Sequence, residues 1–146
     1  MLSADIVNAS DPEGSDACYT PGLKLSARAH VPVLERLRSE GALHGPGVMN
    51  AGTEIWLTGP APTPEQVAIL VSQAFYQTTV GAMSFAPEFT LCQSCGAASR
   101  GLVDECPSCA SRRVDGYALS GDRYSLVSGW DAGLRTELAT RHRGEL

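Results

Sequence analysis

Two pairs of cysteines lie close together in the last third of the chain, and two residues separate the members of each pair. The four thiols belong to Cys92, Cys95, Cys106 and Cys109. Two intervening residues let both sulfurs of one tight turn reach the same metal ion, and a tetrahedral zinc ion takes four such soft ligands. Ten residues, 96–105, separate the pairs, which is enough for a hairpin that brings the second turn beside the first. The spacing predicts a closed, structural zinc site.

Two other interpretations of these cysteines stay open. Two disulfides of a secreted domain would use the same thiols, and a CxxC pair can also be a dithiol redox centre. Five cysteines are an odd number, so full disulfide pairing would leave one thiol over, whereas four zinc ligands leave only Cys18. Gly96 favours the first turn, but Pro107 lies inside the second pair and Ala110 follows it. Zinc is the first interpretation because this spacing is most typical of it.

Length and composition limit the functions that this chain can have. The 146 residues, 43% of them hydrophobic, suffice for one domain with a modest core. No run approaches the roughly 18 to 20 apolar residues of a membrane span, and the N-terminus lacks a basic start and an apolar run. We therefore expect a cytoplasmic protein with reduced thiols. A net charge of −5 disfavours binding of duplex nucleic acid by the whole domain, although six arginines between residues 112 and 143 allow a local anion contact.

The patterning predicts an α+β fold in three parts. Residues 1–17 are rich in Ser, Asp, Gly and Pro and are expected to be a flexible lead-in. Residues 18–87 should form a small helix and strand scaffold. Residues 88–146 should carry the zinc ribbon, a glycine-containing loop and a C-terminal helix.

Local signals place the elements within these parts. A short helix is expected from Pro32 to a stop at Gly41, and a strand over residues 53–58, where β-branched and aromatic residues alternate. The clearest helix begins at the cap Thr63 and should end at Gly81. Its expected core positions are Val67, Leu70, Val71, Ala74, Phe75 and Thr78.

The C-terminal third is expected to be built around the cysteines. Short hairpins should surround the metal between Phe89 and Cys109, followed by a glycine-containing loop from Arg112 to Gly129. Asp131 can cap a terminal helix in which Leu134 and Leu138 form a narrow apolar seam.

No arrangement typical of a hydrolase or transferase is visible. His30, His44 and His142 lie in unrelated sequence contexts, and none adjoins a nucleophile motif. Asp104 and Glu105 are expected to be solvated loop charges. The role of Glu54 is also left open, because it lies on a predicted strand, where alternate residues face water.

The order of motifs adds a resemblance. The segments FAPEFTLCQSCG, CPSC, RRVDGY and SGWDAG, followed by a basic helix, resemble the C-terminus of the anaerobic, glycyl-radical class of ribonucleoside-triphosphate reductases. Cys18-Tyr19-Thr20 also looks like a degraded version of that family's tyrosine-threonine-asparagine-serine segment, and residues 18–87 resemble the end of the family's barrel domain. The likeness covers most of this chain but only the terminal part of the family's length.

The resemblance implies a radical glycine at Gly116. A Cα radical is planar and stabilised by its flanking amides, and a side chain would crowd it. In the family, an S-adenosylmethionine-dependent, iron-sulfur activating enzyme installs this radical. The glycyl radical then generates a thiyl radical on a barrel cysteine, which removes a hydrogen from the ribose.

The sequence also departs from the family pattern. Asp115 stands where a small or thiol-bearing residue is usual, and Gly116 follows Cys109 by only seven residues. If the sequence is instead aligned with the family through the SGWDAG segment, the radical position moves to Gly121 or Asp122. An aspartate could not carry the radical. Two registers, Gly116 and Gly121, therefore stay open. Departures at Asp131 and Leu134 remove part of the family's polar contact set.

The barrel, the nucleotide-binding elements and the thiyl cysteine of the family have no counterpart in this chain, and Cys18 is a poor substitute. We therefore expect that this chain alone does not reduce nucleotides. The leading hypothesis is a portion or separate subunit that presents Gly116 or Gly121 to a partner reductase barrel, which alone would bind ribonucleoside triphosphate. The alternative is a non-catalytic zinc-ribbon binding module that diverged from the family.

Overall fold

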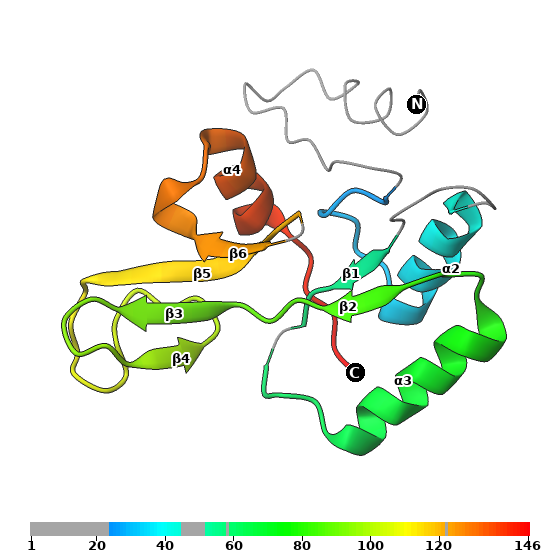
Figure 1. The fold of residues 1–146 in the computed structure, drawn as a ribbon, viewed down its shortest axis with the longest axis horizontal. Helices are drawn as coiled ribbons and strands as arrows, with labels where there is room; N and C mark the ends of the chain where they lie inside the picture. Colours follow the sequence, from blue (N-terminus) through cyan, green and yellow to red (C-terminus); the bar gives the residue numbers. More distant parts are fainter. Residues whose placement is uncertain (1–23, 45–51, 58, 122) are drawn as a thin grey trace.

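The computed structural model describes residues 24–44, 52–57, 59–121 and 123–146. Within these ranges it has an α+β fold with three α-helices and two sheets (Figure 1), as the sequence predicts. The expected flexible lead-in, Cys18 and the segment around Gly45 lie outside the described residues. Every helix within the described ranges is too short or too polar to cross a membrane.

The first half of the described chain forms a lobe around a parallel two-stranded sheet. Strand β1 (Thr53–Ile55) pairs in parallel with β2 (Met83–Phe85), and helix α3 (Pro64–Gln77) connects them. Helix α2 (Val33–Leu43) packs against both β1 and α3. We call residues 24–86 the helical lobe.

The second half forms a lobe around an antiparallel sheet with the strand order β4-β3-β5-β6. We call residues 89–140 the ribbon lobe; in Figure 1 it lies opposite the helical lobe and carries α4 on one side of its sheet. Its elements are β3 (Phe89–Cys92), β4 (Ala98–Arg100), β5 (Val114–Ser120), β6 (Arg123–Leu126), the 3-10 turn η1 (Val127–Gly129) and α4 (Ala132–Thr140).

The start of α3 follows the predicted capping signal. Thr63 accepts a hydrogen bond from the amide of Gln66, and the Gln66 side chain accepts one from the Thr63 amide. Its core positions are only partly as predicted, because Leu70 and Ala74 are buried whereas Val71 and Phe75 are 46% and 78% exposed. A two-stranded sheet is too narrow to cover more than one stripe of a helix. The helix also ends before Gly81, at the cap Thr78.

Gly41 does not end α2, as the sequence suggested, because the helix continues to Leu43. A Cβ at Gly41 would lie 2.6 Å from the amide nitrogen of Val80. This glycine therefore permits close contact between α2 and the segment that follows α3. In the core beside this contact, Leu37 of α2 packs against Ile55 of β1.

The sequence predicts a glycine-containing loop from Arg112 to Gly129, and this prediction is wrong for the central part of the segment. That part forms the hairpin β5–β6. Ser120 pairs with Arg123, so two residues connect the strands. Gly121 has a φ of +65°, as the turn of a two-residue hairpin requires. The segments YALS and RYSL flank the dipeptide Gly-Asp, and this pattern is typical of a hairpin. The resemblance to a radical loop favoured the loop prediction instead.

The predicted cap of α4 is confirmed, since Asp131 Oδ1 accepts a 2.8 Å hydrogen bond from the Leu134 amide. Leu138 is buried against Ala118 and Trp130, with Leu134 at the edge of this cluster. The helix thus covers β5 through the narrow apolar seam that its sequence predicts.

The chain after α4 returns to the helical lobe and ties the two lobes together. The Gly144 amide donates to the carbonyl of Trp56, and the His142 amide donates to the carbonyl of Ala27. Arg141 and Arg143 both bind the carboxylate of Glu88, which lies in the short link between β2 and β3. In Figure 1 this terminal segment runs between the lobes.

The close contact at Gly41 gives a stability prediction. Gly41→Ala should lower the free energy of unfolding by about 1–3 kcal/mol, because overpacking against the Val80 backbone outweighs the better helix propensity of alanine. Chemical denaturation followed by circular dichroism measures this change. Gly81→Ala is the matched control, since a Cβ there would have no neighbour within 4 Å in the part of the chain that the structure describes. Equal stability of both variants would contradict the packing role of Gly41.

Candidate metal centre

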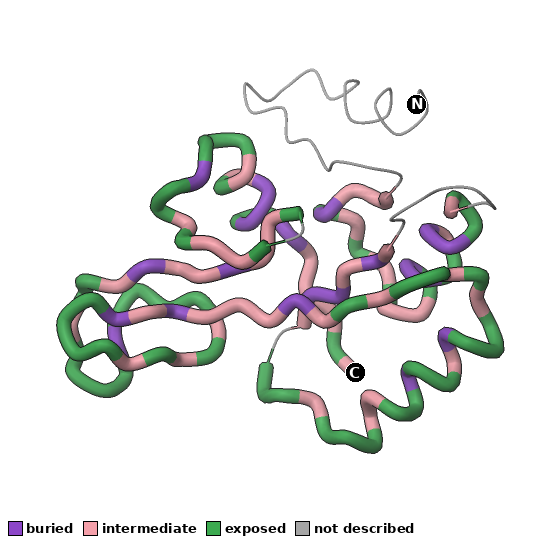
Figure 2. Tube along the Cα trace, viewed as in Figure 1, coloured by how far each residue is buried: buried purple, intermediate pink, exposed green. Residues whose placement is uncertain are grey.

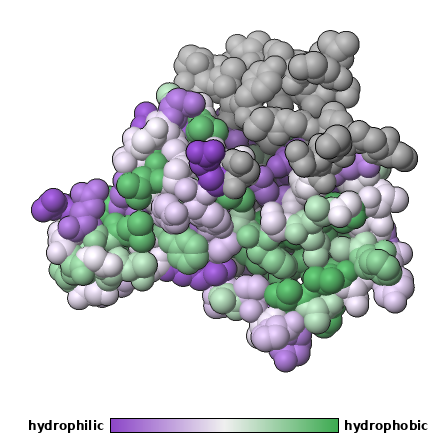
Figure 3. All heavy atoms as spheres, viewed as in Figure 1, coloured by the Kyte–Doolittle hydropathy of each residue, from purple (hydrophilic) through white to green (hydrophobic). Residues whose placement is uncertain are grey.

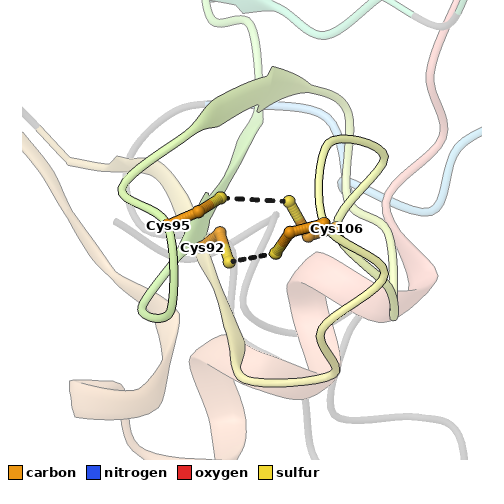
Figure 4. Close-up of side chains that lie close together, drawn as sticks. Cys92, Cys95 and Cys106 are labelled. Atoms are coloured by element: carbon orange, nitrogen blue, oxygen red, sulfur yellow. Dashed lines mark hydrogen bonds between the residues drawn. The ribbon is translucent and has the colours of Figure 1, made fainter.

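The four cysteines of the two CxxC pairs come together at one end of the ribbon sheet (Figure 4). Cys92 is the last residue of β3 and Cys95 lies in the turn that follows, while Cys106 and Cys109 belong to the loop between β4 and β5. Their sulfur atoms all lie within 4.8 Å of one another. The cluster could therefore hold a metal ion.

The distances between sulfurs distinguish metal ligands from disulfides. Cys92 Sγ lies 3.6 Å from Cys109 Sγ, and Cys95 Sγ lies 3.7 Å from Cys106 Sγ. A disulfide bond measures about 2.05 Å, whereas sulfurs about 2.3 Å from a tetrahedral zinc ion are about 3.8 Å apart. All four residues are free cysteines. The geometry is that of four separate ligands and is consistent with zinc.

The two turns have the same local structure despite their different sequences. The Gly96 amide donates to the Cys92 carbonyl, and the Ala110 amide donates to the Cys106 carbonyl. Gly96 has a φ of +72° and Ala110 a φ of +56°. Ala110 thus adopts the left-handed conformation despite its Cβ, at a cost of about 1–2 kcal/mol. The absence of a second glycine does not prevent a matching turn.

Backbone amides within the turns favour the thiolate form of two cysteines. The amide of Cys95, followed by that of Ser94, lowers the pKa of Cys92 to about 6. The amide of Ser108 lowers the pKa of Cys106 in the same way. Thiolates are the metal-binding form of cysteine, so the backbone prepares the turns for a cation.

Crowding of the sulfurs has the opposite effect on Cys109. The amide of Ser111 lowers the pKa of Cys109, but Cys95 and burial outweigh it and raise this pKa to about 12. Four thiolates at this separation repel one another, and a bound dication would offset the repulsion. The cluster is therefore suited to a bound cation.

The cluster is fixed to the start of the β5–β6 hairpin. Cys92 pairs with Val114, and the Gln93 amide donates to the Arg113 carbonyl. Any ordering of the cysteine turns by a metal is thus transmitted directly into β5.

Gly116, the first candidate for the radical residue, lies within a paired strand. It faces Thr90 of β3 and is partly buried. A Cβ at this position would lie 2.8 Å from Val127 Cγ2 and 3.1 Å from Leu102 Cδ2. The two side chains pack over the glycine, which explains its identity on packing grounds alone.

Gly121, the second candidate, lies at the tip of the same hairpin. It is exposed, has a left-handed φ, and a Cβ there would have no neighbour within 4 Å among the described residues. The hairpin places the two candidate glycines in different environments, one covered and one open.

The departures from the family pattern have structural roles. The Asp115 carboxylate is buried and accepts hydrogen bonds from the amide and the hydroxyl of Ser128. This contact fixes the segment after β6, and Asp131 caps α4. Both aspartates stabilise the ribbon lobe itself.

The other polar residues singled out in the sequence do not join the cysteines. Glu54 forms a 2.9 Å ion pair with Lys24, and the exposed Glu105 lies 3.8 Å from Arg112. The rings of His30 and His142 lie against each other with centroids 4.4 Å apart and planes tilted by 35°. Sequence reasoning missed this histidine pair because 111 residues separate its members and no local pattern links them.

The arginines between residues 112 and 143 are only partly available for an anion. Arg141 and Arg143 are bound to Glu88. Arg135 and Arg143 line an open hollow of about 800 Å³ between the lobes, together with Glu88. The carboxylate in this hollow is already paired, and the hollow does not include the cysteines.

Comparison with known proteins agrees with this architecture. A family model described as anaerobic ribonucleoside-triphosphate reductase matches residues 4–143. A solved anaerobic ribonucleotide reductase shares the fold with a TM-score of 0.61 at 20% sequence identity, over 90% of this chain and 20% of that chain. The likeness thus spans about a fifth of the solved chain. A comparison with curated proteins yields no match. Because the family model matches nearly the whole sequence, this chain belongs to the anaerobic ribonucleoside-triphosphate reductase family.

Proposed function

We propose that this chain acts as the C-terminal portion or a separate subunit of an anaerobic ribonucleoside-triphosphate reductase. Its cysteine cluster would bind a structural zinc ion, and its β5–β6 hairpin would present a radical glycine to a partner barrel. The observation that carries this proposal is the attachment of an open glycine hairpin to the cysteine cluster through β3 and β5. Four thiolate ligands leave no coordination site for substrate, so the metal would serve structure alone.

Gly121 suits the radical role better than Gly116. Exposing Gly116 would require β5 to separate from β3 and the side chains of Val127 and Leu102 to move. Gly121 lies at the tip of the hairpin, where it could enter another protein without loss of the sheet. The geometry therefore supports the second register.

The proposed chemistry takes place between this chain and its partners. Gly121 would lose a hydrogen atom from Cα to an S-adenosylmethionine-dependent, iron-sulfur activating enzyme. A cysteine thiol of the partner barrel would return a hydrogen atom to Cα and become a thiyl radical. That radical would remove a hydrogen from the ribose of a ribonucleoside triphosphate bound to the partner. This chain would supply the position of the glycine and exclude competing reactions, in the cytoplasm of an anaerobic cell.

A second candidate function is a non-catalytic zinc-ribbon binding module. The contacts of Asp115 with Ser128 and of Asp131 with the Leu134 amide favour it, because these departures from the family pattern serve folding. Such a module would keep the metal site and the hairpin without forming a radical.

The metal site predicts one tightly bound zinc ion per chain. Removal of zinc by a chelator, or the change Cys92→Ser, should expose the backbone amides of β3 and β5 to hydrogen exchange, because the binding free energy of a structural zinc site is folding free energy. Zinc content is measured by elemental analysis and exchange by mass spectrometry. Ser108→Ala, in the second turn, is the control and should retain the metal. Metal-free protein with two disulfides would overturn the zinc assignment.

The radical site predicts a glycyl doublet in electron paramagnetic resonance. The zinc-loaded chain would be incubated without oxygen with a reduced activating enzyme and S-adenosylmethionine. The signal should disappear in Gly121→Ala and persist in the double variant Gly116→Ala/Val127→Ala. The second change removes Val127 Cγ2, the nearest neighbour of the new Cβ at 2.8 Å, and leaves contacts of 3.1 and 3.2 Å that need only small shifts.

The same experiment separates the two candidate functions. A doublet lost only in the Gly116 double variant would assign the radical to Gly116. Silence of the wild-type chain, with an activating enzyme that works on a complete reductase, would contradict the radical role and favour the binding module. Circular dichroism and zinc content of each variant verify that the fold is intact.

A further inference from the structure

Helix α3 carries large apolar side chains beyond the stripe that faces its own core. Leu70 and Ala74 face the core of the helical lobe. Outside this stripe the helix exposes further large apolar residues, with exposed fractions of 46% to 81%: Ile69, Val71, Phe75 and Tyr76. Figure 2 shows α3 largely exposed, and Figure 3 shows hydrophobic side chains gathered over the same region. Exposed apolar side chains that gather on one surface mark an interaction site.

The sheet beside this helix has an open edge. The Thr53 amide bonds to the Ala82 carbonyl, and the Ala86 amide bonds to the Ile55 carbonyl. Since successive residues of a strand point their backbone groups to opposite sides, the amides and carbonyls of Met83 and Phe85 face away from β1. They have no hydrogen-bond partner within the described ranges. The edge of β2 could accept another strand.

A parallel pair joined by a helix is a fragment of a larger type of sheet. Parallel sheets occur almost only with several strands and with helices that cover their faces, and two strands alone are marginal in water. The β1–α3–β2 unit has only two strands within the described residues, and the outer edge of β2 is unpaired there. Its open edge and its apolar helix have the same explanation, which is that a neighbouring strand and helix belong beside them.

We propose that β2 and α3 form the docking surface for a reductase-family catalytic chain, which adds a parallel strand next to β2 and covers Phe75 and Tyr76. This inference rests on the proposed function, because it specifies how the partner barrel binds. Met83 and Phe85 already pack partly against Leu70 and Ala74, so an added strand would extend an existing core.

A catalytic chain fits this surface better than a second copy of this protein does. The solved reductase shares only 20% of its length with this chain, so most of such a fold lies outside the shared segment. Continuing the parallel sheet requires a strand that runs in the direction of β2. A twofold axis perpendicular to the sheet would instead pair β2 with its copy in the opposite direction.

Two single changes would test the surface, and circular dichroism of each variant checks that the isolated chain keeps its fold. Phe75→Asp places a charge on the exposed side of α3. Met83→Pro removes an amide that faces away from β1, so the donor for an added strand is lost. Because Met83 also packs partly against Leu70 and Ala74, Met83→Ala is its control: it loses the same packing, keeps the amide and should lose less affinity. Val103→Asp is the control for Phe75→Asp, because Val103 is also exposed, at 41%, but lies in the ribbon lobe.

The tagged full chain would be incubated with an oxygen-free extract of the cells that carry its gene. Bound proteins would be identified by mass spectrometry, and the partner purified for affinity measurement. We expect a reductase-family catalytic chain whose affinity falls at least about tenfold in Phe75→Asp and in Met83→Pro and is unchanged in Val103→Asp.

Three results would overturn the proposal: no reductase-family chain is captured, the affinity is equal in all variants, or sedimentation shows a homodimer that Phe75→Asp dissociates. Binding is scored without radical chemistry, so its failure is distinct from failure of the proposed function. A glycyl doublet without binding through β2 and α3 would leave the radical role standing and remove only this surface. Binding through β2 and α3 without a doublet would support this surface and contradict the radical role.

Discussion

The arrangement of the two lobes depends on one buried ionic contact, in which the Glu88 carboxylate binds Arg141 and Arg143. Glu88 lies between the sheets, and the arginines lie just beyond α4. The Arg141 side chain is 3% exposed, pairs also with Glu137, and stacks 4.5 Å from the centre of the Trp56 ring. Loss of one partner from such a contact costs about 3–5 kcal/mol, because a charge is left buried and unpaired. The contact therefore fixes where the ribbon lobe sits relative to β1 and β2.

The ribbon lobe in turn depends on its cysteine turns. Two short strands and a hairpin bury little apolar surface, with Ala118, Trp130 and Leu138 as their main core. A metal held by four thiolates would supply the cohesion that this core lacks. Its ligand bonds would add to the backbone pairing with β3 and β6 that sets the position of β5. A hairpin built in this way can be rigid at its base and open at its tip.

Features encoded within a few residues could be predicted from the sequence, and features that depend on distant partners could not. The cysteine turns, the Thr63 capping box and the Asp131 cap were recognisable because each is a local pattern. Gly41 was misread as a helix end because its role depends on Val80, 39 residues away. The contact between Glu88 and Arg141 left no sequence signal for the same reason. Phe75 was predicted to be a core residue because it follows the helical spacing of apolar residues. That spacing does not indicate which of the apolar side chains pack against the rest of the same chain.

Residues near the C-terminus contact residues much earlier in the sequence, and this affects how the protein folds during synthesis. Gly144 bridges to Leu57 and bonds to Trp56, and His142 bonds to Ala27. The helical lobe thus lacks its closing contacts until residues 142 and 144 have left the ribosome. Until then the segment around Trp56 is open to chaperones or to a partner chain that is already folded. Contacts with such large sequence separations slow folding, which lengthens this interval and gives assembly time to compete with closure.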